Sequence, residues 1–199
     1  MFIQIIQGRC TRQDELRAHA GTWRDELAPG AKGWLGGTYG FTDDDQFVGI
    51  VRFESKEAAT ANSERPEQGA WAERFMALMD GPVEFHDCDD VTLMMDGGSD
   101  SAGFVQVIRG RVNDPDRLKA LMTDTEMLHE ARPDILGATL AFEDDGTFTE
   151  TIAFTTEAEA RDGEQREMPD MPADVRETLD AAMQGATFWD LHRPWFESR

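Results

Sequence analysis

Short apolar runs alternate with stretches of helical periodicity along this chain. The runs are rich in β-branched and aromatic residues and end at turn signals such as 42–46, which is typical of strands. Elsewhere Leu16, Ala20, Trp23 and Leu27 recur at the spacing of one buried helix face. The pattern predicts, in order, strand 2–9, helix 12–28, strands 34–41 and 47–54, a helical region 56–79 broken at Pro66, strand 83–94, strand 104–111, helix 115–131, strands 135–142 and 147–155, helices 157–166 and 173–184, and strand 186–192.

The sequence itself repeats. FIQIIQGR at 2–9 returns as FVQVIRGR at 104–111, with five of the eight positions identical. GGTYGF at 36–41 returns as GATLAF at 137–142. Such long repeats exceed the units of solenoid proteins, so we expect two small domains. We place the first repeat at 1–95, a flexible Gly- and Ser-rich linker at 96–103, and the second repeat with a C-terminal tail at 104–199.

Each repeat has the order β-α-β-β-α-β, which is the ferredoxin-like unit with helices on one face of an antiparallel sheet. Its strands are apolar on both faces: Phe2 and Ile6 point to one side, Ile3 and Ile5 to the other. The face without helices needs cover, and the second repeat is the expected partner. We therefore predict an α+β chain of two fused ferredoxin-like repeats whose sheets pack into an intramolecular dimeric α/β barrel, which replaces a homodimer.

Composition and charge limit the kinds of partner that the chain is expected to bind. Its 199 residues carry a formal net charge of −21, and the acidic residues are spread over both halves. Such a surface repels phosphate backbones, so we expect no binding to nucleic acid. No apolar run approaches the roughly 20 residues of a membrane span, and no signal peptide is visible, so we expect a cytoplasmic protein without membrane contact. Cys10 and Cys88 are expected to be reduced thiols, with a disulfide as the alternative.

The doubled element order, the length near 90 residues per copy, the Gly-rich strand 34–41, the Phe-rich strand 47–54 and the Trp-bearing second helix resemble the dimeric α/β-barrel superfamily. Within it, the chain looks like the antibiotic-biosynthesis-monooxygenase-like (ABM-like) proteins. The resemblance implies a ligand pocket between each sheet and its helices. Family members include cofactor-free monooxygenases of polycyclic phenols, haem-degrading enzymes, chlorite-dismutase-like haem proteins and proteins of no known activity. The haem-degrading branch places an Asn, a Trp and a His in the pocket; here Gln4 replaces the Asn, while Trp71 and His86 are present.

Four residues of the first repeat could supply the chemistry of such a pocket. We predict His86 and Tyr39 as catalytic, because an imidazole titrates near neutrality and a phenol can donate to a bound carbonyl. We predict Arg52 and Trp71 as substrate-binding. Structural roles stay open for each: an edge position for His86, packing for Tyr39 and Trp71, and a salt bridge for Arg52.

The second repeat lacks these side chains. It carries Leu140, Ala153 and Val175 at the positions that match Tyr39, Arg52 and Trp71, so we expect the main pocket in the first repeat. His86 and Cys88 have no third or fourth metal ligand nearby in the sequence, and no phosphate loop or dinucleotide fingerprint occurs, so we expect neither a metal nor an organic cofactor. Three functions remain open: a cofactor-independent monooxygenase or related enzyme on a small aromatic substrate, a non-enzymatic small-ligand-binding protein, and a haem-binding protein.

Overall fold

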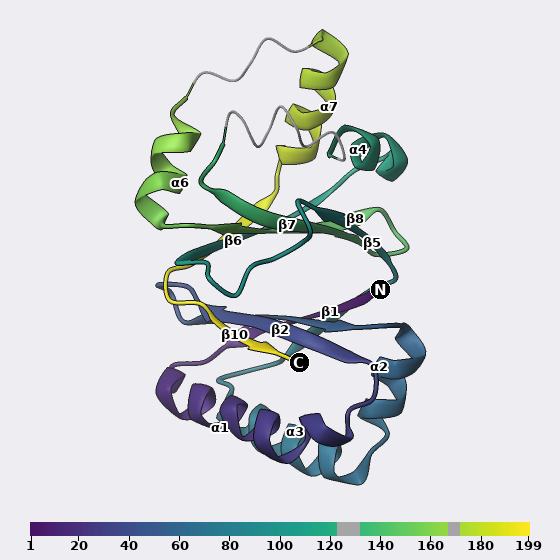
Figure 1. The fold of residues 1–199 in the computed structure, drawn as a ribbon, viewed down its shortest axis with the longest axis vertical. Helices are drawn as coiled ribbons and strands as arrows, with labels where there is room; N and C mark the ends of the chain where they lie inside the picture. The colour runs from purple at the N-terminus through teal and green to yellow at the C-terminus, as the bar shows by residue number, and fades with distance from the viewer. Residues whose placement is uncertain (123–131, 167–171) are drawn as a thin grey trace. The chain divides into compact units, whose positions relative to one another are not determined.

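The computed structural model describes residues 1–122, 132–166 and 172–199 (Figure 1). The chain forms two compact units that do not coincide with its two halves. Unit 1 contains Met1–Asp89 together with Trp195–Arg199, and unit 2 contains Asp90–Pro194. Among the described residues, no helix is both long enough and apolar enough to cross a membrane.

Unit 1 is a five-stranded antiparallel sheet with helices on one face (Figure 1). The strand order is β10-β2-β3-β1-β4. Local sequence explains the helix starts: the Ser55 side chain caps α2 by accepting from the Ala58 backbone N–H, and Pro66 occupies the first turn of α3. Its elements are β1 (Phe2–Arg9), α1 (Gln13–Glu26), the 3-10 turn η1 (Ala28–Gly30), β2 (Trp34–Phe41), β3 (Gln46–Phe53), α2 (Lys56–Ser63), α3 (Pro66–Leu78), β4 (Glu84–Cys88) and β10 (Trp195–Ser198).

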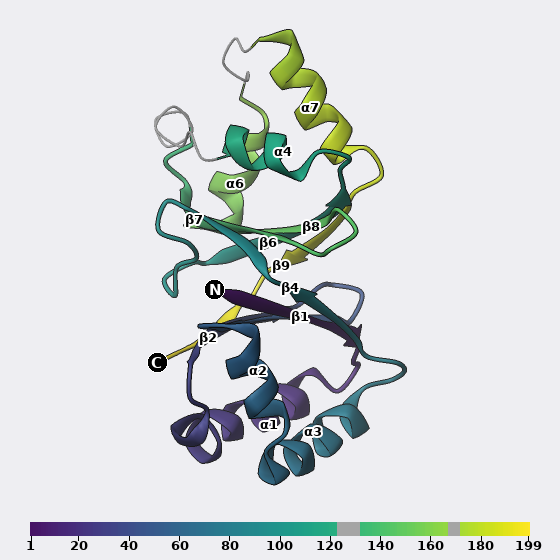
Figure 2. The ribbon, with the colours of Figure 1, turned by 90° about the vertical axis from the view of Figure 1, so that its right-hand side faces the viewer.

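Unit 2 repeats this plan, again with its helices on one face of the sheet (Figure 2). The strand order is β5-β7-β8-β6-β9. The register of β2 against β3 shifts between Trp34 and Gly36, and that of β7 against β8 shifts between Ile135 and Gly137, so both copies keep the same irregularity. The described elements are β5 (Asp90–Met94), β6 (Phe104–Arg111), α4 (Pro115–Met122), β7 (Ile135–Phe142), β8 (Thr147–Phe154), α6 (Glu157–Glu164), α7 (Ala173–Met183) and β9 (Thr187–Leu191).

The predicted α+β fold of two ferredoxin-like repeats is confirmed. Each sheet is open, with two edge strands, and neither closes on itself. The packing of the two sheets into one barrel stays a prediction. The second half of the predicted helix 115–131 lies outside the described residues.

The two repeats exchange edge strands, which the sequence did not predict. The predicted strand 83–94 is wrong as a single strand: it divides at Asp89, where β4 ends, and β5 pairs with β7 of unit 2. Adjacent acids at Asp89 and Asp90 interrupt its apolar alternation. In return, the tail forms β10, which pairs with β2 of unit 1. Each sheet therefore has five strands instead of four, and the repeat boundaries at 95 and 104 stay predictions about the sequence.

Two apolar clusters in unit 1 lie between the sheet and its helices. The first joins β1, α1, β2, β3 and α2 through Phe2, Trp23, Leu27, Trp34, Phe53 and Ala59. The second joins α1, β3, α3 and β10 through Leu16, Phe47, Phe75, Met79 and Trp195. Trp71 packs against both clusters.

Candidate functional site

Unit 1 contains a cavity of about 190 Å³ between the sheet and its helices. A mostly apolar wall with a few polar groups is typical of ligand pockets. The volume is below the usual range of ~300–1,000 Å³ but exceeds the ~150 Å³ that holds a benzene ring. Eight of the twenty residues that line the cavity are aromatic: Trp23, Trp34, Tyr39, Phe47, Phe53, Trp71, Phe75 and Phe85. The polar lining comes from Gln4, Asn62, Ser63, Gln68 and Glu197.

Trp71 is a cavity wall held in place by α1. Its ring stacks on His19, with centroids 4.7 Å apart, and on Phe75 at 5.3 Å. Its indole N–H donates to the His19 carbonyl oxygen at 3.3 Å and to Thr22 Oγ1 at 3.2 Å. In return, His19 Nε2 donates to the Trp71 carbonyl oxygen at 3.1 Å. The polar atom of the indole is thus satisfied by the scaffold, and the ring contributes apolar surface to the cavity wall.

The Tyr39 ring lies over two glycines, Gly37 and Gly49, which we call the glycine floor. A Cβ atom on Gly37 would be 2.0 Å from the Tyr39 hydroxyl oxygen, and one on Gly49 would be 3.1 Å from Tyr39 Cδ1. The ring also stacks on Trp195, with centroids 5.5 Å apart. Burial raises the pKa of the Tyr39 phenol well above its usual range, while the Arg52 charge lowers it less. The phenol is therefore a protonated hydrogen-bond donor at neutral pH.

Arg52 and His86 lie on the other face of the sheet. Ile6 and Phe85 are paired neighbours on the cavity side, so His86, paired with Ile5, points away from the helices. Arg52 alternates in the same way with Val51 and Phe53, which line the cavity.

These two residues have other partners on that face. Arg52 donates to Thr38 Oγ1 at 2.9 Å, and His86 Nε2 lies 3.6 Å from Glu84 Oε2. The structure thus brings Tyr39 and Trp71 together and places Arg52 and His86 elsewhere. The roles of all four residues stay predictions.

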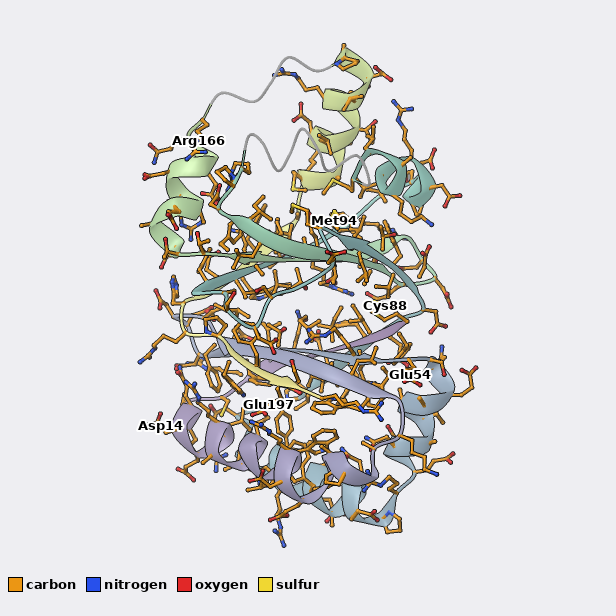
Figure 3. All side chains as sticks on the ribbon, in the orientation of Figure 1. Asp14, Glu54, Cys88, Met94, Arg166 and Glu197 are labelled. Atoms are coloured by element: carbon orange, nitrogen blue, oxygen red, sulfur yellow. The ribbon has the colours of Figure 1, made fainter. Side chains whose placement is uncertain are left out.

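Several polar residues of the cavity were missed from the sequence, and two of them, Trp34 and Glu197, have a buried polar atom without a hydrogen-bond partner among the described residues. The indole Nε1 of Trp34 is buried, and among the described residues no hydrogen-bond partner reaches it. Glu197 comes from β10, where it pairs with Gly37 (Figure 3). No sequence signal showed that this strand joins the sheet of the first repeat.

Comparison with known proteins shows the fold. No family model and no curated protein matches the chain. A candidate monooxygenase from Fusobacterium nucleatum subsp. nucleatum ATCC 25586 superimposes with a TM-score of 0.74 at 10% identity, over 100% of this chain and 94% of its own. An anthrone oxidase-like protein gives 0.66 at 11% identity, over 99% and 89%. A ferredoxin fold protein from Listeria monocytogenes 4b F2365, related to antibiotic biosynthesis monooxygenases, gives 0.52 at 8% identity, over 100% and 95%. This chain has the ABM-like fold.

The two copies of the ABM-like fold share a polar contact beside the cavity position. In unit 1, Gln4 Nε2 donates to Asp87 Oδ1 at 2.9 Å, and in unit 2, Gln106 Nε2 donates to Asp190 Oδ1 at the same distance. This contact ties β1 to the edge strand β4 in unit 1 and β6 to the edge strand β9 in unit 2. Because both copies have it, the Gln4 contact is not specific to the cavity of unit 1.

Unit 2 fills the space that Tyr39 occupies in unit 1. Leu140 stands at the position of Tyr39 and Ala138 at that of Gly37, and both belong to a packed core cluster. Glu150 replaces Gly49 on the same face; burial raises its pKa to about 7. The glycine floor is thus a feature of the first copy of the ABM-like fold.

Metal ligands and thiols do not add to the cavity. Within the described ranges, no group of three or more His, Cys, Asp or Glu side chains could hold a metal ion. Cys10 and Cys88 are both buried and are not joined in a disulfide; that they are reduced thiols stays a prediction. Among the described residues, the groups that line the cavity are its aromatic side chains, including the Tyr39 phenol and the Trp34 indole, and a few polar side chains.

Proposed function

We propose that unit 1 binds a small aromatic molecule in its cavity and oxidises it with O₂ as a cofactor-independent monooxygenase. The aromatic-walled cavity of about 190 Å³, with the Tyr39 phenol at its floor, is the observation that carries this proposal. The relation of other proteins of this fold to monooxygenases and to an anthrone oxidase supports the choice of reaction. One or two fused rings suit the volume, by comparison with the ~150 Å³ that holds benzene.

The reaction needs no external reductant. When a phenol is converted to a quinone by O₂, one oxygen atom enters the ring, the other leaves as water, and the substrate supplies all the electrons. Tyr39 stays protonated and can donate a hydrogen bond to an oxygen of the ring as negative charge develops there. The indole N–H of Trp34 is a second donor for such an oxygen. The aromatic wall, including Trp71, excludes water and orients the ring.

The cavity size argues against haem as the ligand. A haem has four linked pyrrole rings, whereas the volume only slightly exceeds that of a cavity for one benzene ring. The sequence comparison with the haem-degrading branch also required Trp71 and His86 to share one pocket, but they lie on different faces of the sheet. A haem-binding function would thus need a site other than this cavity.

Oxygen uptake with a panel of phenols tests the proposal. We expect 1-naphthol or a related phenol to consume one O₂ per quinone formed. The Tyr39→Phe variant should lower kcat by about 10- to 100-fold, because one buried donor to the developing charge is lost. His86→Ala is the matched control: it removes a titratable group on the other face and should leave kcat unchanged.

Three results would overturn this assignment in different ways. Tight binding of the phenols without oxygen uptake would identify the non-enzymatic alternative. If phenols fail to bind at all, the cavity is not their site. A fall in rate for His86→Ala with none for Tyr39→Phe would move the chemistry to the other face of the sheet.

A further inference from the structure

The cavity of unit 1 is completed by a residue near the C-terminus. Glu197 lies on β10, directly opposite Gly37 in the strand register. Because Gly37 has no side chain, the neighbouring space on the helix-covered face is open to the Tyr39 ring and to Glu197. Glu197 and Tyr39 both line the cavity, and the Glu197 charge adds to burial, the main cause, in raising the pKa of Tyr39.

The Glu197 carboxylate keeps capacity for another hydrogen bond. Its Oε2 lies 3.3 Å from Arg24 Nη1 in an ion pair with α1, but that contact lacks hydrogen-bond geometry. This oxygen is buried, and within the described part of the chain no hydrogen-bond donor reaches it. A carboxylate has about four acceptor positions, and a buried one that lacks donors gains from a ligand that brings one.

Side-chain packing and strand pairing fix the position of β10, which carries this carboxylate. Trp195, at the start of the strand, is buried and stacks on Tyr39, and its ring also lies 5.6 Å from that of Phe41. The Arg17 guanidinium lies over the same indole at 5.1 Å from its centroid. Four residue pairs join β10 to β2. The strand is thus positioned by packing, and Glu197 follows it.

We propose that Glu197 selects the ligand by accepting a hydrogen bond from a hydroxyl group on its aromatic ring. The C-terminal strand of the second repeat then sets the specificity of a cavity built by the first repeat. This inference rests on the proposed function, because it assumes that the cavity binds an aromatic molecule. A hydrogen bond from O–H to a carboxylate is among the stronger kinds, so a ring without a donor binds more weakly.

Three naphthalene probes separate the hydroxyl from the ring. 1-Naphthol has a donor, 1-methoxynaphthalene keeps the oxygen without the donor, and naphthalene has neither. Equilibrium dialysis gives a Kd for each probe without relying on tryptophan signals. We expect the wild type to bind 1-naphthol at least about tenfold more tightly than 1-methoxynaphthalene, the effect of one hydrogen bond to a charged group.

The Glu197→Gln variant should reduce that preference to within about threefold and leave naphthalene binding unchanged, which also shows that the cavity persists. Glu54→Gln is the matched control: it removes the same charge from an exposed carboxylate of unit 1 outside the cavity, and should keep the wild-type preference. If the wild type binds all three probes equally, Glu197 does not select the ligand, although the cavity binds aromatics. If the preference survives in Glu197→Gln, another acceptor is responsible. If no probe binds the wild type, the proposed function itself fails.

Discussion

The fit of Tyr39 over Gly37 gives the sharpest prediction. In the Gly37→Ala variant the new methyl group would lie 2.0 Å from the Tyr39 hydroxyl oxygen and 2.3 Å from Cζ. The ring cannot tilt away easily, because it stacks on Trp195 and contacts Gly49 below. Overpacking of this kind costs about 1–3 kcal/mol, whereas alanine in a strand gains about 0.5–1 kcal/mol over glycine. We therefore expect a net loss of about 1–2 kcal/mol in the free energy of unfolding.

The second copy shows which change relieves the clash. There Ala138 and Leu140 stand at the positions of Gly37 and Tyr39, and both are packed in the core. In the Tyr39→Leu background, Gly37→Ala should thus be neutral or slightly stabilising. The four proteins of this double-mutant cycle give a coupling energy of about 1–3 kcal/mol between the two positions.

Urea unfolding followed by tryptophan fluorescence measures this coupling. Four of the five tryptophans belong to unit 1, so the signal reports mainly the unit that carries the substitutions. The slope against urea should stay the same in all four proteins, which shows that only stability changes. A coupling energy below about 0.5 kcal/mol would mean that the Tyr39 ring does not lie over Gly37, and the cavity floor would have to be redrawn.

Other predictions concern protonation, helix capping and charge. The folded state raises the pKa of Glu150 to about 7 from 4.5, so it holds a proton that the unfolded chain releases between these values; the free energy of unfolding should fall by about 3 kcal/mol as the pH rises from 4.5 to 7. In the Glu150→Gln variant, the free energy of unfolding measured with urea should no longer fall between pH 5 and pH 8. If the variant loses as much stability over this pH range as the wild type, the burial of Glu150 is contradicted. Ser55→Ala and Thr156→Ala each remove a cap, at 3.3 Å from Ala58 N and 3.2 Å from Glu159 N, and should each cost about 1 kcal/mol in the same assay; no loss would show that the caps contribute nothing. With its charge of −21 the protein should not shift DNA or RNA in gels at physiological salt, and a shift that weakens as salt rises would refute this.

The sequence predicts the fold better than the site. Hydrophobic alternation and the repeat of 2–9 at 104–111 are properties of the chain itself, so the element order followed from them. The pairing partners of a strand cannot be read from the sequence in this way. The pattern in 83–94 is equally compatible with one strand or two, and β5 joins a different sheet from β4. The same limit hid Glu197, because a strand of four residues carries no mark of the sheet that it joins.

Strand alternation alone could have shown that Arg52 and His86 lie on the face of the sheet opposite the cavity. Phe47 and Phe53 mark the helix-covered face of β3, and Arg52 falls on the opposite face by simple counting. His86 alternates with Phe85 in the same manner. Tyr39 was proposed from the sequence because it is the only tyrosine of the chain, its phenol can donate a hydrogen bond, and the second copy has Leu140 at its position. The glycine floor beneath it could not be predicted, since it depends on the direction in which the Tyr39 ring leans.

The exchange of edge strands affects the order in which unit 1 is completed during synthesis. Its residues up to Asp89 are made before unit 2, but β10 is made only after unit 2. At about 5–20 residues per second, roughly 5–20 s separate Asp89 from Trp195. Throughout that interval β2 is an uncovered sheet edge, open to pairing with other chains, and the cavity lacks Glu197. Pairing of β10 with β2 therefore completes the cavity wall and covers that edge of the sheet at the same moment.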